Sequence, residues 1–156
     1  MVNFIQLNIC KKEMLLGQRN NQETQKWTHT QDEILLHNHL NFINSFKIRD
    51  DKFYFVLKNE DKYLSVVDFS NFANDSCKFE FYLNQFLVIA EISRVLEKIL
   101  IDYVFKILKI PVLGLEVFND NSQVINLNKK YNFSEIKRKV ASKKEVQCVE
   151  LKNENR

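Results

Sequence analysis

Two histidines stand two positions apart, at His37 and His39, in a segment whose apolar residues repeat at helical spacing. Histidine pairs often bind metal ions, but residues two apart on a helix point about 200° away from each other. One ion therefore cannot bind both imidazoles. The sequence also lacks a His-Glu-x-x-His run, so we expect no metal site.

Four polar or aromatic residues could instead bind a small nucleotide-like ligand. Arg19 and Asn20 follow a helical segment, and arginine suits phosphate because it donates two parallel hydrogen bonds. The alternative is an ordinary surface arginine. Trp27, the only tryptophan, could stack on a base or pack between two helices. His39 could contact a substrate or be a half-buried structural histidine.

The cysteine pattern and the hydropathy indicate in which cell compartment the protein is expected. Cys10, Cys77 and Cys148 are widely spaced and form no Cys-x-x-Cys pair, which favours reduced thiols over a disulfide framework or a zinc site. The first residues, MVNFIQLNICKKE, have no positive region before their apolar residues and so do not resemble a signal peptide. Charges interrupt every long apolar stretch, so we expect no membrane partner and a cytoplasmic location.

The net charge of +3 makes the chain mildly basic and suits an anionic ligand. A nucleic-acid binder usually carries a stronger, clustered excess of positive charge. The densest basic cluster, KRKVASKKE from Lys137 to Glu145, is expected to be a solvated hairpin connection. We therefore expect no nucleic acid as a partner.

Hydrophobic periodicity predicts the strands and helices that position these residues. Their order along the chain is β-α-α-β-β-β-α-β-α-β-β. The expected strands cover residues 2–8, 52–58, 62–72, 77–85, 112–118, 133–139 and 145–152. The expected helices cover residues 11–21, 30–47, 90–108 and 122–131, the second opening at Thr30 or Gln31.

This order predicts a single α+β domain over residues 1–156, with a mostly antiparallel central sheet flanked by helices. One parallel crossover should join the strand near Tyr82 to the strand near Val117 through the helix at 90–108. The chain has only two glycines and one proline, so we expect Asn and Asp to take the turn positions that glycine usually fills.

Five stretches within this order carry a family resemblance. The chain resembles the GCN5-related N-acetyltransferases over nearly its whole length, and among them the acetyltransferases of pseudaminic-acid biosynthesis. The stretches are QRNN (18–21), HLNFI (39–43), VVDFSNF (66–72), CKFEFYLN (77–84) and LEVFNDN (115–121).

The resemblance implies that an acetyl group passes from acetyl-CoA to the amine of a UDP-linked amino-deoxy sugar, without a metal. In such enzymes the amine attacks the thioester directly, and backbone N–H groups of the fourth strand polarise its carbonyl. Tyr82 and Leu83 would lie on that strand. Arg19, Asn20, Trp27 and His39 are the expected substrate-binding residues, and a homodimer is possible.

The family's general acid is a tyrosine on the helix after the fifth strand, which protonates the departing thiolate. This chain has Asn128 at that position, and an amide can hydrogen-bond a thiolate but cannot supply the proton. Tyr131, one helical turn on, could substitute for the acid or simply pack. Glu116 could orient water or the amine, and Glu80 is a further candidate for a general base.

The family also binds the CoA diphosphate with a glycine-rich loop before the central helix. If Arg94 and Val95 begin that helix, Glu91 and Ser93 occupy the glycine positions. In a second register Val88 and Ala90 occupy them, and neither register restores a glycine. Asn121 matches an Asn that such folds use near CoA.

These departures keep a second hypothesis open. The chain could be a non-catalytic protein of the same fold that binds an acyl-CoA, a nucleotide sugar or a protein partner.

Overall fold

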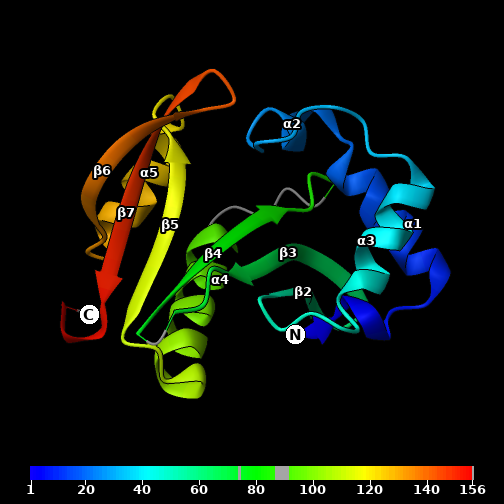
Figure 1. Cartoon of the computed structure of the whole chain (residues 1–156), viewed down its shortest axis with the longest axis horizontal. Coiled ribbons are helices and arrows are strands. Elements are labelled where there is room, and N and C mark those ends of the chain that lie inside the picture. Colours follow the sequence, from blue (N-terminus) through cyan, green and yellow to red (C-terminus); the bar gives the residue numbers. More distant parts are fainter. Residues whose placement is uncertain (74, 87–91, 156) are drawn as a thin grey trace. The chain divides into compact units, whose positions relative to one another are not determined.

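The computed structural model describes residues 1–73, 75–86 and 92–155. These residues form two compact units (Figure 1). Unit 1 holds residues 1–70 and 81–86 of the described chain, and unit 2 holds residues 71–73, 75–80 and 92–155. The predicted α+β class is confirmed, because strands and helices follow one another in nearly the predicted order.

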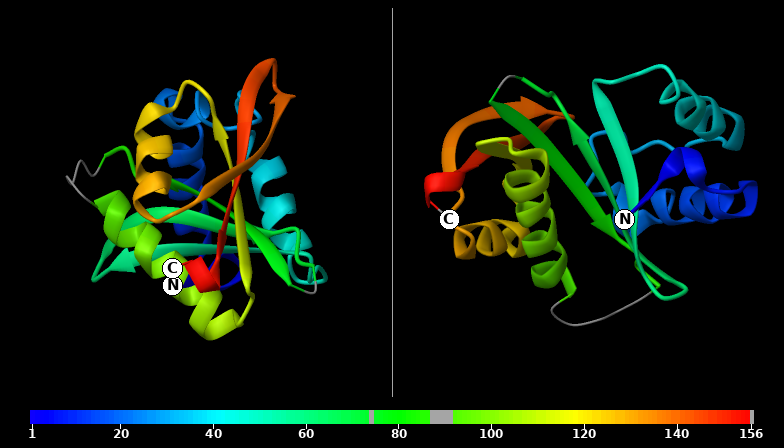
Figure 2. Two further views of the ribbon diagram at one scale, coloured as in Figure 1. Left: turned by 90° about the vertical axis from the view of Figure 1, so that its left-hand side faces the viewer. Right: turned by 90° about the horizontal axis from the view of Figure 1, so that it is seen from below.

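Unit 1 packs helices on one side of antiparallel strands (Figure 2). Its core joins the two sides through six buried apolar residues: Phe4, Leu7, Leu15, Ile43, Val56 and Val66. Its elements are β1 (Val2–Asn3), a 3₁₀ turn (Phe4–Gln6), α1 (Ile9–Arg19), α2 (Gln22–Gln25), α3 (Leu36–Ser45), β2 (Lys52–Asn59) and β3 (Lys62–Ser70).

Two boundaries in unit 1 were predicted wrongly, and side-chain hydrogen bonds explain both. The first strand ends at Asn3, because the Asn3 side chain accepts a hydrogen bond from Ile5 N at 3.0 Å and turns the chain into a 3₁₀ helix. The helix expected from Thr30 begins only at Leu36. Ahead of it, the Asn20 amide bonds both backbone groups of Ile34, at 2.8 and 3.0 Å, and so holds this segment extended.

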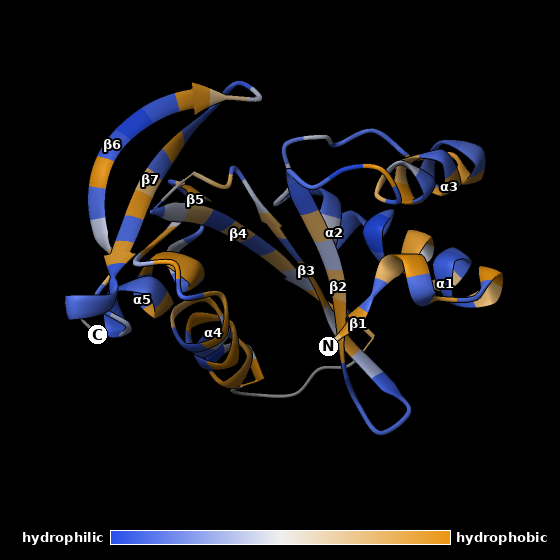
Figure 3. Ribbon diagram, turned by 60° about the horizontal axis from the view of Figure 1, so that its bottom comes forward, coloured by the Kyte–Doolittle hydropathy of each residue, from blue (hydrophilic) through white to orange (hydrophobic). Residues whose placement is uncertain are grey.

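Unit 2 contains the start of β4 (Ser76–Leu83), whose last residues belong to unit 1. The other elements of unit 2 are α4 (Ile92–Asp102), a π-helical turn (Tyr103–Leu108), β5 (Val112–Phe118), α5 (Ser122–Lys130), β6 (Ser134–Ala141), β7 (Lys144–Lys152) and a final 3₁₀ turn (Asn153–Asn155). Figure 3 shows how strongly apolar α4 is, which fits a helix that packs against a sheet.

The strand order is β1-β2-β3-β4-β5-β7-β6. β4 pairs in parallel with β5, from Ser76 opposite Val112 to Lys78 opposite Gly114. β7 pairs antiparallel with both β5 and β6. The predicted crossover through a central helix is therefore confirmed. The first two residues of that predicted helix, Ala90 and Glu91, lie outside the described residues.

Turns in this glycine-poor chain use a wider set of residues than predicted. Six described non-glycine residues have positive φ: Glu60, Asn71, Lys109, Asn132, Ser142 and Lys143. Asn is among them as expected, but Asp is not. Ser142 and Lys143 form the whole β6–β7 turn, so the basic stretch from Lys137 to Ala141 is strand rather than the hairpin connection that we expected.

Among the residues that the structure describes, no helix is long and apolar enough to cross a membrane.

Candidate active site

The four expected catalytic residues, Glu80, Glu116, Asn128 and Tyr131, all belong to unit 2. Four of the expected cofactor-binding residues lie there too: Ser93, Arg94, Val95 and Asn121. Unit 1 holds Tyr82 and Leu83 with the expected substrate-binding residues Arg19, Asn20, Trp27 and His39. Ala90 and Glu91, with Val88 of the second loop register, lie outside the described residues.

Asn128 lies on α5, a helix that Asn121 caps by accepting a hydrogen bond from Val124 N at 3.3 Å. The Asn128 side chain is 3% exposed. Its Nδ2 has no hydrogen-bond partner in the structure, although a buried amide donor normally has one. Asn128 therefore has a buried N–H₂ group whose hydrogen-bonding capacity is unused in the structure.

Tyr131 ends α5 and contacts the start of α4. Its hydroxyl donates to the backbone carbonyl oxygen of Arg94 at 2.7 Å. Burial, with a smaller effect from the Glu97 carboxylate, raises the pKa of Tyr131. A phenol with a raised pKa is a weaker acid, so these contacts favour a packing role for Tyr131 over that of a substitute acid.

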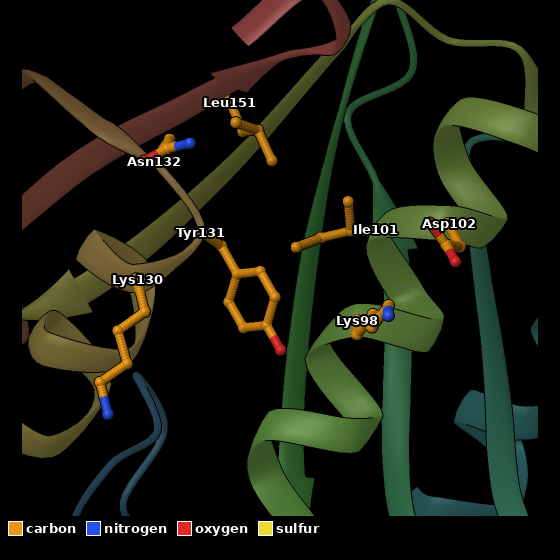
Figure 4. Close-up of a pocket in the computed structure, with 7 residues that line it drawn as sticks. All are labelled: Lys98, Ile101, Asp102, Lys130, Tyr131, Asn132 and Leu151. Carbon is orange, nitrogen blue, oxygen red and sulfur yellow. The ribbon is translucent and has the colours of Figure 1, made fainter. Parts of the chain in front are cut away.

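Tyr131 also lines a surface pocket of about 210 Å³ within unit 2. Figure 4 shows its ring directed from the end of α5 toward α4. The other lining residues are Lys98, Ile101, Asp102, Lys130, Asn132 and Leu151.

Glu116 on β5 is held by two lysines, one from the adjacent strand β4 and one from β6, which lies beyond β7. Its carboxylate pairs with Lys78 of β4, and its Oε2 lies 2.7 Å from Lys139 Nζ of β6. Burial opposes the charged form, but the hydrogen bonds from Lys139 and Lys78 outweigh it and lower the pKa of Glu116. A carboxylate held in this way is a weak base. Glu80 is exposed, and its charge contributes to the raised pKa of Lys139.

Sequence reasoning missed Glu97, which lies on α4 and is 1% exposed. Neither of its carboxylate oxygens has a hydrogen-bond partner in the structure, and burial raises the pKa of Glu97 to about 8. The signal was present in the sequence. Glu97 precedes Leu100 and Ile101 by three and four residues, which places it on the same apolar face of the helix.

The first turn of α4 carries polar, charged and apolar side chains. Arg94 and Val95 are exposed, and Ser93 is half-buried. A serine hydroxyl and an arginine near a helix N-terminus are groups that favour anions. Leu83 is half-buried near the end of β4, where the next residue, Asn84, donates from Nδ2 to Tyr63 O at 2.9 Å.

In unit 1, two of the expected substrate residues make structural contacts. Asn20 uses its amide to bind Ile34, as described above. His39 is buried and donates from Nε2 to the Lys12 carbonyl oxygen at 3.0 Å, which links α3 to α1. Burial lowers the pKa of His39, so the imidazole is neutral near pH 7.

Arg19 and Trp27 are the other two expected substrate residues in unit 1. Arg19 Nη2 donates to the Thr30 carbonyl oxygen at 2.6 Å, whereas its Nη1 is buried without a partner in the structure. Trp27 is 38% exposed, and Lys26 Nζ lies 5.6 Å from its ring centroid. In the described part of the chain, no three His, Cys, Asp or Glu side chains gather so that they could hold a metal ion.

No family model matches the sequence. The chain is similar to the acetyltransferase PseH of Campylobacter jejuni serotype O:2, with 29% identity over 132 residues, 85% of this chain and 82% of that protein. The PseH of serotype O:23/36 is 28% identical over 132 residues, again 85% of this chain and 82% of that protein.

Solved structures of two acetyltransferases have the same fold as this chain. The crystal structure of C. jejuni PseH in complex with acetyl coenzyme A superposes with a TM-score of 0.77 at 24% identity, over 97% of this chain and 96% of that one. The spermidine N-acetyltransferase of Vibrio cholerae, in complex with CoA and spermine, gives a TM-score of 0.85 at 16% identity, over 96% and 94%.

The fold is therefore that of the GCN5-related N-acetyltransferases, and the predicted resemblance to this class is confirmed. Within the class, the sequence similarity is to the acetyltransferase PseH, as the five stretches indicated. Sequence and fold together support the prediction of an acetyl-CoA-dependent N-acetyltransferase.

Proposed function

We propose that this protein transfers an acetyl group from acetyl-CoA to the amine of a UDP-linked amino-deoxy sugar of the pseudaminic-acid type. The observation that carries the proposal is the buried, unpartnered Nδ2 of Asn128. By the resemblance to the family, Asn128 stands where the general acid would lie on α5. The similarity to PseH supports the choice of a sugar acceptor.

In this reaction the amine nitrogen attacks the thioester carbonyl carbon, the C–S bond breaks, and CoA leaves as a thiolate. The amine loses one proton, and the thiolate can gain one from solvent. Asn128 Nδ2 donates a hydrogen bond to the sulfur as negative charge develops there, so it stabilises the leaving group without transferring a proton. The contact of Tyr131 with Arg94 keeps α5 against the first turn of α4.

The resemblance implies roles for the remaining site residues, and these roles are part of the proposal. Ser93 and Arg94 on the first turn of α4 bind the CoA diphosphate, and Tyr82 and Leu83 on β4 bind its pantetheine arm. Arg19 binds the sugar diphosphate, and Trp27 stacks on the uracil. A place in bacterial surface-glycan or flagellin modification, a cytoplasmic location and a homodimer remain predictions.

A non-catalytic protein of the same fold is the second candidate. Two observations favour it: Asn128 replaces an acid, and Glu116 is already neutralised by Lys78 and Lys139. Such a protein would still bind a CoA ester or a nucleotide sugar, but it would release no CoA.

Calorimetric titration with acetyl-CoA tests the cofactor assignment. We expect roughly micromolar affinity, about −8 kcal/mol. Desulfo-CoA, which lacks the sulfur, is expected to bind more weakly because it offers nothing to Asn128. No binding heat at millimolar acetyl-CoA would contradict the proposal and favour a protein partner.

A further inference from the structure

Strands β4 and β5 are paired along only part of their length. Their described parallel ladder covers three residues of each strand and ends where Lys78 lies opposite Gly114. Both strands run on beyond this pair, β4 to Leu83 and β5 to Phe118. The course of β4 past Lys78 therefore depends on more than its ladder with β5.

An ion pair joins the two strands just past the end of this ladder. The Lys78 ammonium group pairs with the Glu116 carboxylate. Glu116 follows Gly114 by two residues, so both face the same side of the sheet. The Lys78 side chain thus crosses to β5 and reaches forward along it, past its own register partner.

Gly114 leaves room for the Lys78 side chain to cross β5. It is one of only two glycines in the chain. Lys78 Cγ lies 3.5 Å from the point that a Cβ at Gly114 would occupy, so the aliphatic part of Lys78 packs against the strand. The Glu116 side chain that receives the ammonium group is only 7% exposed. Burial of the carboxylate fixes the end point of this crossing.

Lys139 pairs with the same carboxylate but joins different strands. Its Nζ lies 2.7 Å from Glu116 Oε2 and reaches over β7 from β6. Ladders of seven pairs already join β5 to β7 and β7 to β6, so this ion pair adds little to their spacing. The Lys78 ion pair differs because it lies past the last pair of its ladder.

We propose that the Lys78–Glu116 ion pair fixes the direction in which β4 leaves its ladder with β5, and so positions β4 to bind the acyl-CoA arm. The arm carries amide groups, which can hydrogen-bond to the edge of a strand. This inference rests on the proposed function and extends it, because it assigns the position of β4 to one ion pair. Lys78 and Glu116 are positioning residues and do not contact the reacting atoms.

The test compares two variants that each remove one lysine from the same carboxylate. Lys78→Met breaks the link between β4 and β5. Lys139→Met is the matched control and breaks only the link to β6. The two lysine side chains are similarly exposed, 35% and 43%, and each variant leaves Glu116 with the other lysine.

Calorimetry with acetyl-CoA separates the two variants. Because a small misplacement of a binding group is costly, Kd should rise at least about tenfold in Lys78→Met and stay within about twofold of wild type in Lys139→Met. A role in stability alone would not separate the two affinities. A folded Lys78→Met protein with wild-type affinity, or an equal loss of affinity in both variants, would overturn the inference.

A conservative variant adds a rescue. A guanidinium group also pairs well with a carboxylate, so Lys78→Arg should bind acetyl-CoA nearly as tightly as wild type. A loss of affinity in Lys78→Arg as large as in Lys78→Met would overturn the inference. If Lys78→Met does not fold, Lys78→Ala removes the same ammonium group and is judged by the same criteria.

The titration needs no sugar, so its result does not depend on the acceptor. If acetyl-CoA binds but the sugar is not acetylated, the proposed acceptor is wrong, and the difference between Lys78→Met and Lys139→Met still decides the inference. No binding of acetyl-CoA to the wild type would overturn the inference together with the proposed function.

Discussion

Replacing Glu97 with Gln is expected to stabilise the protein, by an amount that grows with pH. Burial raises the pKa of Glu97 in the folded chain to about 8, against an ordinary value of 4.5. Between these values the unfolded chain loses the proton and the folded chain keeps it. The folded state therefore binds more protons, and its stability falls as pH rises.

The size of this effect follows from the two pKa values. Each pH unit between them costs the wild type about 1.4 kcal/mol, so about 3 kcal/mol is lost by pH 7. A glutamine at this position does not ionise. The free energy of unfolding of Glu97→Gln, relative to wild type, should thus rise steadily from about pH 5 to pH 8 and then level off.

Urea denaturation of both proteins at several pH values measures this difference. Glu13→Gln, at an exposed carboxylate on α1, is the control and should give a nearly constant difference. A difference for Glu97→Gln that stays flat from pH 5 to pH 8 would mean that Glu97 is ionised in the folded chain and has a partner.

Replacing Asn128 with Tyr should raise kcat by about a hundredfold. The reason is that a phenol can protonate the departing thiolate, and a positioned general acid contributes about 10²–10⁴-fold. We expect the low end of this range because the CoA thiolate is a fair leaving group unaided. Steady-state release of CoA at saturating acetyl-CoA measures the change.

Two variants of α5 make this test specific. Asn126→Tyr places the same side chain at an exposed position of the helix and should leave kcat unchanged. Asn128→Leu removes the amide, so kcat should fall, while stability should rise by about 1 kcal/mol because a buried unpartnered donor is lost. A folded Asn128→Tyr protein with unchanged kcat would argue that α5 does not reach the thioester.

Most strands of the sheet and the helix α5 could be predicted from the sequence. The signals that define them, hydrophobic periodicity and turn residues, lie within the segments themselves. Asn121 caps α5 directly ahead of its apolar positions, and β7 alternates buried with half-buried residues on either side of the buried pair Cys148 and Val149. The extended segment before α3 could not be predicted. It depends on Asn20, which is distant in sequence from Ile34 and holds it through side-chain hydrogen bonds.

The roles of the candidate site residues remain predictions, and the structure adds the surroundings of each side chain. The resemblance identified Asn128, and the structure adds that its amide is buried and unpartnered. From the sequence, Glu116 was expected to be an available carboxylate. In the structure it forms ion pairs with Lys78 and Lys139, which lie on two other strands and are distant from it in sequence. Such long-range pairing leaves no local pattern in the sequence.

The most direct test of acetyl transfer is to incubate the protein with acetyl-CoA and UDP-4-amino-4,6-dideoxy-N-acetyl-altrosamine. Mass spectrometry follows the sugar, and a thiol reagent follows CoA. We predict one acetyl group added to the sugar for each CoA released, with both products dependent on both substrates. A folded protein that binds acetyl-CoA yet forms neither product would contradict the proposed acetylation of this sugar.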